Sequence, residues 1–129
     1  MRYANYNITE FIGNLILTYP DRFVINIYCK TEEAVDYFTN KFTDLFYNTN
    51  TIKTEMQDIV RFVNNNKELN IFKTIETIIL RGKRCSFALI EDKLSIEVID
   101  NLINPMCNLP VHLPSMLFAI SDINEDEEE

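Results

Sequence analysis

Two adjacent carboxylates are the residues of this sequence best placed to do chemistry. Glu91 and Asp92 follow a continuous apolar run, residues 85–90, that is typical of a buried strand. Because a rigid strand fixes the position of its end, one carboxylate could hold a divalent cation while the other activates a water for phosphoryl transfer. Acidic residues also follow strands in ordinary solvated turns, so the pair alone leaves both interpretations open.

Arg81, Arg84 and Ser121 are the next candidates. The two arginines lie just before the same apolar run and could contact a phosphate or a partner subunit. Ser121 follows the last strand that the sequence predicts. A loop arginine is more often a solvated surface charge, so that alternative stays open for both arginines.

Histidine and cysteine give no recognisable catalytic motif. His112 is the sole histidine and has no His, Cys or Ser partner within a known pattern. Cys29, Cys85 and Cys107 lack C-x-x-C spacing, and we expect them to be reduced structural thiols.

Periodic apolar positions predict the helices and strands that would hold these residues. Helical spacing covers residues 8–18 and 32–46, the second with Thr31 as its amino-terminal cap. Continuous apolar runs predict buried strands, and two alternating runs around three asparagines predict a hairpin. The strands are expected at residues 23–29, 59–63, 69–73, 85–90 and 116–120, with a further short helix at 95–103. This alternation predicts an α/β fold, with a mostly parallel sheet and flanking helices.

Length and charge predict one domain with an acidic tail. The chain has 129 residues and a net charge of -8, and six of its acidic residues lie in residues 122–129. We expect residues 1–121 to form the domain and residues 122–129 to form a disordered tail, with a partner-binding tail as the alternative. There is no signal-like start and no apolar stretch of about 18 residues, so we expect an intracellular protein without a membrane partner.

Four segments, taken in order, resemble the ATPase domain of the large terminases that package double-stranded DNA in tailed phages and herpesviruses. They read INIYCKTEEAVDYF, RFVNNNKELNIF, ILRGKRCSFALIED and LFAISD, and the resemblance covers roughly residues 7–122. In that family a strand and an amphipathic helix precede a hairpin, an Arg-Gly segment, a strand ending in two acids, and a strand ending in a coupling segment. The resemblance implies a truncated RecA-like P-loop ATPase core.

The resemblance also implies roles for the two carboxylates. Glu91 occupies the position of the family's metal-binding Asp, and Asp92 that of its catalytic Glu, so the pair is present in reversed order. Asp92 is one methylene shorter than Glu, which leaves its carboxylate on the order of 1.5 Å short of a water held for in-line attack. Because a misplacement of about 1 Å can lower a rate about a hundredfold, we expect inefficient hydrolysis.

The phosphate-binding loop is the larger departure from the family. Residues 7–10 stand where a Gly-Lys-Thr/Ser run is expected, with Ile8 in place of the lysine and Thr9 as a degenerate nucleotide-binding position. Only six residues precede this run, too few for a strand and a glycine-rich loop, so we expect the family's first strand to be missing. By the same resemblance, Arg81 would contact the nucleotide and Ser121 would belong to the coupling segment.

Two functions follow as hypotheses. The first is a split or vestigial packaging-motor subunit that is inactive alone and binds Mg²⁺ and ATP only if another segment completes the phosphate-binding loop. Its expected partners are the remaining terminase segment or subunits and, through them, the portal and DNA during virion assembly, in the host cytoplasm or nucleus. The alternative is a non-catalytic α/β scaffold that regulates a viral or host protein. For the first, residues 7–10, Glu91, Asp92 and Ser121 must meet at one end of the sheet.

Overall fold

A fully buried strand lies at the centre of the computed structural model, which describes residues 2–5, 7–73 and 83–123. This strand, β2 (Phe23–Tyr28), has apolar side chains on both of its faces. Ile25 and Ile27 point into one apolar layer, and Val24 and Tyr28 point into another. A strand with this pattern needs cover on both faces, and the rest of the chain supplies it.

The described residues form one mostly parallel sheet in the order β1-β7-β6-β2-β5-β4-β3. β2 pairs in parallel with β5 and β6, and β7 pairs in parallel with β6 and β1. Among these strands, β4 is antiparallel to both of its neighbours. The other strand bounds are β1 Arg2–Tyr3, β3 Ile52–Glu55, β4 Ile59–Asn64, β5 Lys67–Phe72, β6 Phe87–Glu91 and β7 Met116–Phe118.

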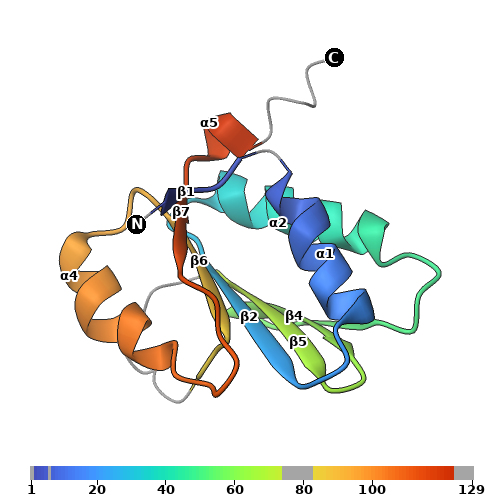
Figure 1. Cartoon of the computed structure of the whole chain (residues 1–129). Coiled ribbons are helices and arrows are strands. Elements are labelled where there is room, and N and C mark those ends of the chain that lie inside the picture. The colour runs from blue at the N-terminus through green and yellow to red at the C-terminus, as the bar shows by residue number, and fades with distance from the viewer. Residues whose placement is uncertain (1, 6, 74–82, 124–129) are drawn as a thin grey trace.

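Helices cover the sheet on both faces, giving three layers (Figure 1). On one face lie α1 (Ile8–Thr18) and α2 (Glu32–Leu45), whose apolar stripes pack on Phe87 and Leu89 of β6. On the other face lies α4 (Ile96–Val98), continued by a π-helical stretch at Ile99–Ile103 and a 3₁₀ turn at Asn104–Met106. Ala88 and Ile90 of β6 face that layer. The predicted α/β fold is therefore confirmed.

Local sequence signals account for the two long helices. The Thr31 side chain accepts a hydrogen bond from the Ala34 N–H, which caps the amino end of α2 as expected. Gly13 lets α1 approach α2 closely, because a Cβ atom there would lie 2.6 Å from Leu45 Cδ2. No helix among the described residues has both the length and the apolar character to cross a membrane.

Several boundaries differ from those expected from the sequence. β1 and β3 were not predicted, and the last strand ends at Phe118 because Ile120 begins a short helix, α5 (Ile120–Ile123). Asp122 and Ile123, which we assigned to the acidic tail, belong to that helix, since Ile123 is buried and its carbonyl accepts a hydrogen bond from the Tyr37 hydroxyl. Arg81 and residues 124–129 lie outside the described residues.

Candidate functional site

Most of the candidate residues lie at the carboxyl edge of the sheet, which is the side where the parallel strands end. Glu91 ends β6 and pairs in register with Phe118, the last residue of β7. The amino end of α1 and the short helix α5 lie at this same edge (Figure 1). Thr9, in the first turn of α1, and Ser121, in α5, are thus on the same edge as the two acids. Ligands in open α/β folds bind at such an edge.

Glu91 is engaged with the loop between β2 and α2. Its side chain is fully buried. One carboxylate oxygen accepts hydrogen bonds from the backbone N–H groups of Lys30 at 2.6 Å and Thr31 at 2.9 Å. The other accepts a hydrogen bond from the Thr31 hydroxyl at 2.9 Å. A carboxyl group that already accepts three hydrogen bonds from its own protein has little remaining capacity to coordinate a cation.

Asp92 is more open than Glu91 and joins three strands. Its backbone N–H donates to the carbonyl of Phe118 at 2.9 Å, which extends the pairing of β6 with β7. Its carboxylate accepts a hydrogen bond from the Tyr3 hydroxyl at 3.3 Å, and Tyr3 belongs to β1. Partial desolvation, together with the negative charges of Asp92 and Asp122, raises the pKa of Tyr3. The outer part of this edge is therefore negatively charged.

The connection from β1 to α1 is short and tightly turned. Four residues separate β1 from α1, and among the described ones the Asn5 side chain accepts a hydrogen bond from the Asn7 N–H at 2.9 Å. The Asn5 carbonyl also accepts from the Ile8 N–H at 3.1 Å. A phosphate-binding loop, G-x-x-x-x-G-K-[ST], is longer and wraps its backbone amides around the phosphates. Here, in contrast, the Asn7 amide donates its hydrogen bond to the Asn5 side chain.

The first two residues of α1 face the core. Ile8 and Thr9 are each 6% exposed, so neither side chain extends from the sheet edge toward a ligand. The expectation of a missing first strand is wrong, because β1 pairs in parallel with β7 and leads through the short turn into α1. The sequence did not reveal β1 because a strand of only two exposed residues has no apolar pattern.

Arg84 lies away from the candidate site. It precedes β6 and is therefore at the opposite edge of the sheet from Glu91. Its guanidinium group donates to the Asn108 side chain at 2.7 Å and to the Asn108 carbonyl at 3.3 Å. Arg84 thus helps to hold the segment that follows the 3₁₀ turn. Ser121, in contrast, lies on α5 and is exposed.

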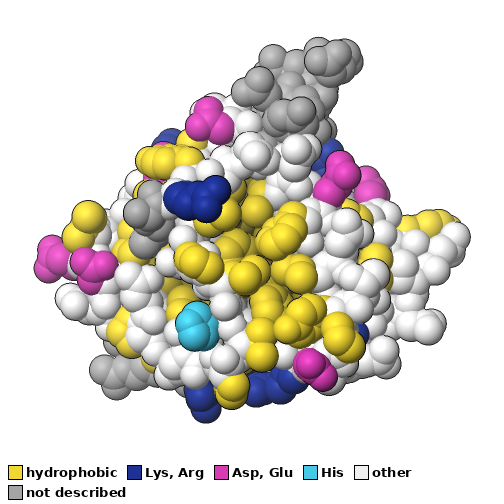
Figure 2. All heavy atoms as spheres, viewed as in Figure 1, with side chains coloured by type: hydrophobic (Ala, Val, Ile, Leu, Met, Phe, Trp, Pro, Cys, Tyr) yellow, Lys and Arg dark blue, Asp and Glu magenta, His cyan; other side chains and the backbone are white. Residues whose placement is uncertain are grey.

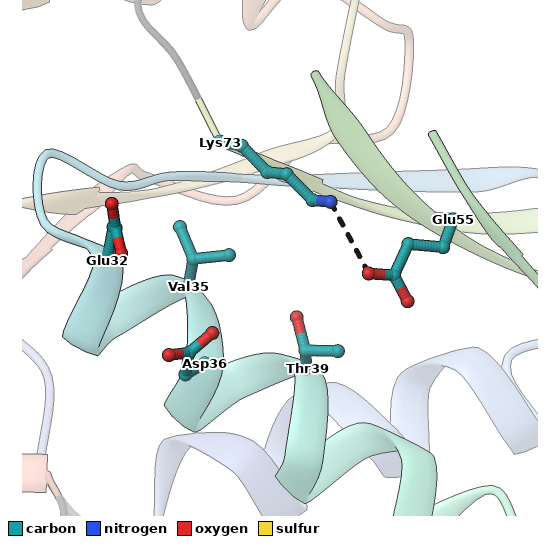
Figure 3. A pocket seen from close by; sticks show the side chains of 6 residues that line it. All are labelled: Glu32, Val35, Asp36, Thr39, Glu55 and Lys73. Atoms are coloured by element: carbon teal, nitrogen blue, oxygen red, sulfur yellow. Dashed lines mark hydrogen bonds and ion pairs between the residues drawn. The ribbon is translucent and has the colours of Figure 1, made fainter. Parts of the chain in front are cut away.

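A pocket of about 290 Å³ lies further along the same sheet edge, between α2 and the ends of β3 and β5. Six side chains line it, and Figure 3 shows them facing one another: Glu32, Val35, Asp36, Thr39, Glu55 and Lys73. The Lys73 ammonium group lies 3.5 Å from the Glu55 carboxylate and donates to the Met56 carbonyl at 2.9 Å. Because three acids outnumber this one paired lysine, the pocket repels a triphosphate rather than binding it.

An apolar hollow lies on the face of the sheet that α1 covers, near the outermost strand β1. Its volume is about 380 Å³, and its lining is mostly apolar: Arg2, Phe11, Phe87, Leu113, Pro114, Ser115 and Met116. Figure 2 shows apolar side chains gathered over this part of the molecule, between α1 and the segment that leads into β7. Phe11 is 44% exposed at the hollow. β1 is the last strand of the described sheet on this side.

Mg²⁺ and ATP do not fit the described residues. No group of three or more His, Cys, Asp or Glu residues in the described ranges is arranged to hold a metal ion. Glu91 accepts three hydrogen bonds, the buried Ile8 side chain carries no charge, and Asp92 and Asp122 place negative charge near Tyr3. The roles assigned to Thr9, Glu91, Asp92 and Ser121 from the resemblance therefore stay predictions.

The fold matches those of solved terminase structures. The ATPase domain of the large terminase from Thermus phage P74-26 superposes with a TM-score of 0.60 at 11% identity, over 92% of this chain and 59% of that one. The large terminase from a thermophilic bacteriophage gives a TM-score of 0.56 at 10% identity, over 86% of this chain and 29% of that one. That second enzyme in complex with ADP gives a TM-score of 0.55 at 9% identity, over 86% of this chain and 28% of that one.

These comparisons establish the fold. The resemblance to the terminase ATPase domain is confirmed at that level, and the chain spans less than two thirds of each of these proteins. No protein-family model matches the sequence. A search of curated proteins also finds no match.

Proposed function

We propose that this chain is a split or vestigial relative of the large-terminase ATPase that does not hydrolyse ATP on its own and serves as one part of a viral DNA-packaging machine. The observation that carries this proposal is that only four residues separate β1 from α1, too few for a phosphate-binding loop, and that the Asn7 N–H bonds to the Asn5 side chain. The terminase fold of the chain supports the packaging role.

The chemistry of the sheet edge supports the absence of activity. Hydrolysis needs donors that replace water around the triphosphate and a carboxylate that positions the attacking water. Here Ile8 offers no charge, and Asp92 is short for its role and is bonded to Tyr3. Binding of Mg²⁺ and ATP would require a phosphate-binding segment from another polypeptide, and the remaining terminase subunits are the partners that the proposal expects.

A phosphate-release assay tests this proposal. The purified chain with ATP and Mg²⁺ is expected to release phosphate no faster than a blank without protein, and the Asp92→Ala variant is expected to behave identically. Circular dichroism would verify that both proteins are folded. Turnover by the wild-type chain that disappears in the Asp92→Ala variant would overturn the proposal.

The second candidate function is a non-catalytic scaffold, and the apolar hollow favours it. The lining of this hollow is mostly apolar, and Phe11 is partly exposed to solvent there, so an apolar side chain of a partner could be buried in it. The hollow lies close to β1, at the end of the described sheet, and an extended apolar segment of a partner could both fill the hollow and continue the sheet. In this case the chain would regulate a viral or host protein that is not a terminase component.

A pair of surface variants tests this second function. Phe11→Glu places a charge at the hollow, whereas Tyr47→Glu changes a side chain that is 76% exposed just after α2. A partner identified by mass spectrometry from infected cells should be lost with the first variant and kept with the second. Retention by both variants would reject the hollow as the binding surface. If the partner is a terminase subunit, the result supports the packaging-subunit proposal instead.

A further inference from the structure

Two cysteines that are distant in sequence lie side by side in the layer that contains α4. The Cys85 and Cys107 sulfur atoms are 3.5 Å apart. Cys85 lies just before β6, and Cys107 follows the 3₁₀ turn at Asn104–Met106. Cys29 is separate from them, because it is buried in the layer of α1 and α2 on the other face of the sheet.

The backbone holds the two cysteine segments together. The Cys85 N–H donates to the Met106 carbonyl at 2.8 Å, and the Leu109 N–H donates to the Cys85 carbonyl at 3.5 Å. A disulfide has a sulfur–sulfur distance of about 2.05 Å, so the sulfur atoms must close a gap of roughly 1.5 Å. Because the two backbone segments are already hydrogen-bonded to each other, we expect rotation about the Cα–Cβ bonds to close this gap.

The two thiols are chemically unequal. Cys85 is fully buried, and its pKa is raised by the hydrogen bond with Cys107 and by burial. Cys107 is half-buried, and the hydrogen bond with Cys85 lowers its pKa although desolvation opposes this change. Burial raises the pKa of the Cys29 thiol well above its usual range, and the Glu91 charge adds to this effect. Because Cys107 is more exposed than Cys85 and its pKa is lowered, it is the thiol of this pair best suited to react first.

We propose that Cys85 and Cys107 are a redox-modification site that forms a reversible intramolecular disulfide with hydrogen peroxide as the oxidant. The Cys107 thiolate attacks one peroxide oxygen, the O–O bond breaks, and hydroxide leaves, giving a sulfenic acid. The Cys85 sulfur then attacks the Cys107 sulfur and releases its proton, and the hydroxyl group leaves as water. Two thiols and one peroxide yield one disulfide and two waters, and a dithiol reductant reverses the change.

The disulfide would tie the layer of α4 to the sheet. It joins residues 22 positions apart, and the enclosed segment includes β6 with Glu91 and the whole α4 layer. Closing a loop of this size restricts the unfolded chain, which stabilises the folded state. Oxidation is therefore expected to raise the melting temperature by roughly 10 °C, and dithiothreitol should reverse the rise.

Thiol counting after peroxide treatment tests the proposal. The chain has three cysteines, so the free thiols measured in denaturant should fall from three to one, and peptide mapping should link Cys85 with Cys107. The Cys29→Ser variant should form the same link and raise its melting temperature equally. The Cys107→Ala variant should keep both of its thiols, and its melting temperature should not change with peroxide.

Three outcomes would overturn the proposal. The first is a chain that keeps all its thiols at a peroxide concentration that oxidises a small-molecule dithiol. The second is a disulfide that includes Cys29 or joins two chains. The third is a Cys107 that advances to the sulfinic acid while Cys85 stays free. Folding of each variant is verified beforehand by circular dichroism, and Cys107→Ser replaces the alanine variant if that one unfolds.

Discussion

Glu91 joins two elements of the fold through its buried carboxylate. It receives three hydrogen bonds from the loop between β2 and α2, and two of them come from Thr31, which also caps α2. The side chain thus joins the end of β6 to the start of a helix on the same face as α1. Its neighbour Asp92 has one hydrogen bond through its carboxylate, from the exposed Tyr3.

These different environments predict different stabilities for two matched variants. Glu91→Ala removes three hydrogen bonds to a fully buried carboxylate and leaves the part-buried donors of Lys30 and Thr31 without this acceptor, so it should lower the free energy of unfolding by about 3–5 kcal/mol. Asp92→Ala removes one long hydrogen bond at a partly exposed position and should cost about 1 kcal/mol or less. Urea unfolding followed by circular dichroism measures both. Equal losses, or a larger loss for Asp92→Ala, would contradict the structural role of Glu91.

At the scale of elements, the sequence predicts those helices and strands whose apolar residues recur at regular spacing. The helices at 8–18 and 32–46 and the hairpin around three asparagines were found within a few residues, because each has an apolar stripe, a cap or a turn signal. β3 was missed because all four of its residues are exposed, so it has no buried face to reveal it. The last strand was predicted to extend to Ile120, because a single buried isoleucine does not distinguish the end of a strand from the start of a helix.

The candidate site was predictable in its position but not in its contacts. Because parallel strands share their carboxyl edge, the order of the elements was enough to bring Glu91, Asp92 and Ser121 to one side. The partner of Glu91 lies 60 residues away at Thr31, and no local pattern links the two. Nor does the sequence reveal that Tyr3 lies in a strand beside β7, since that strand has only two residues.

The whole molecule combines a terminase fold with a sheet edge that does not suit a nucleotide. The chain follows the fold over most of its length, with 92% of its residues matched to the P74-26 ATPase domain. At the edge where a nucleotide is expected, the Asn7 N–H bonds to the Asn5 side chain, Ile8 and Thr9 are buried, and Asp92 and Asp122 place negative charge near Tyr3. These features are the ones on which the proposal of an inactive packaging subunit rests.

Titration of the chain with ATP and Mg²⁺ in a calorimeter tests this central claim most directly. Because the Asn7 N–H is bonded to Asn5 and the buried Ile8 side chain carries no charge, we predict no saturable heat up to about 1 mM nucleotide, and the same result for Thr9→Ala. A titration with Mg²⁺ alone controls for weak cation binding at the acidic edge. Saturable binding of one nucleotide per chain, weakened by Thr9→Ala or Asp92→Ala, would contradict the account.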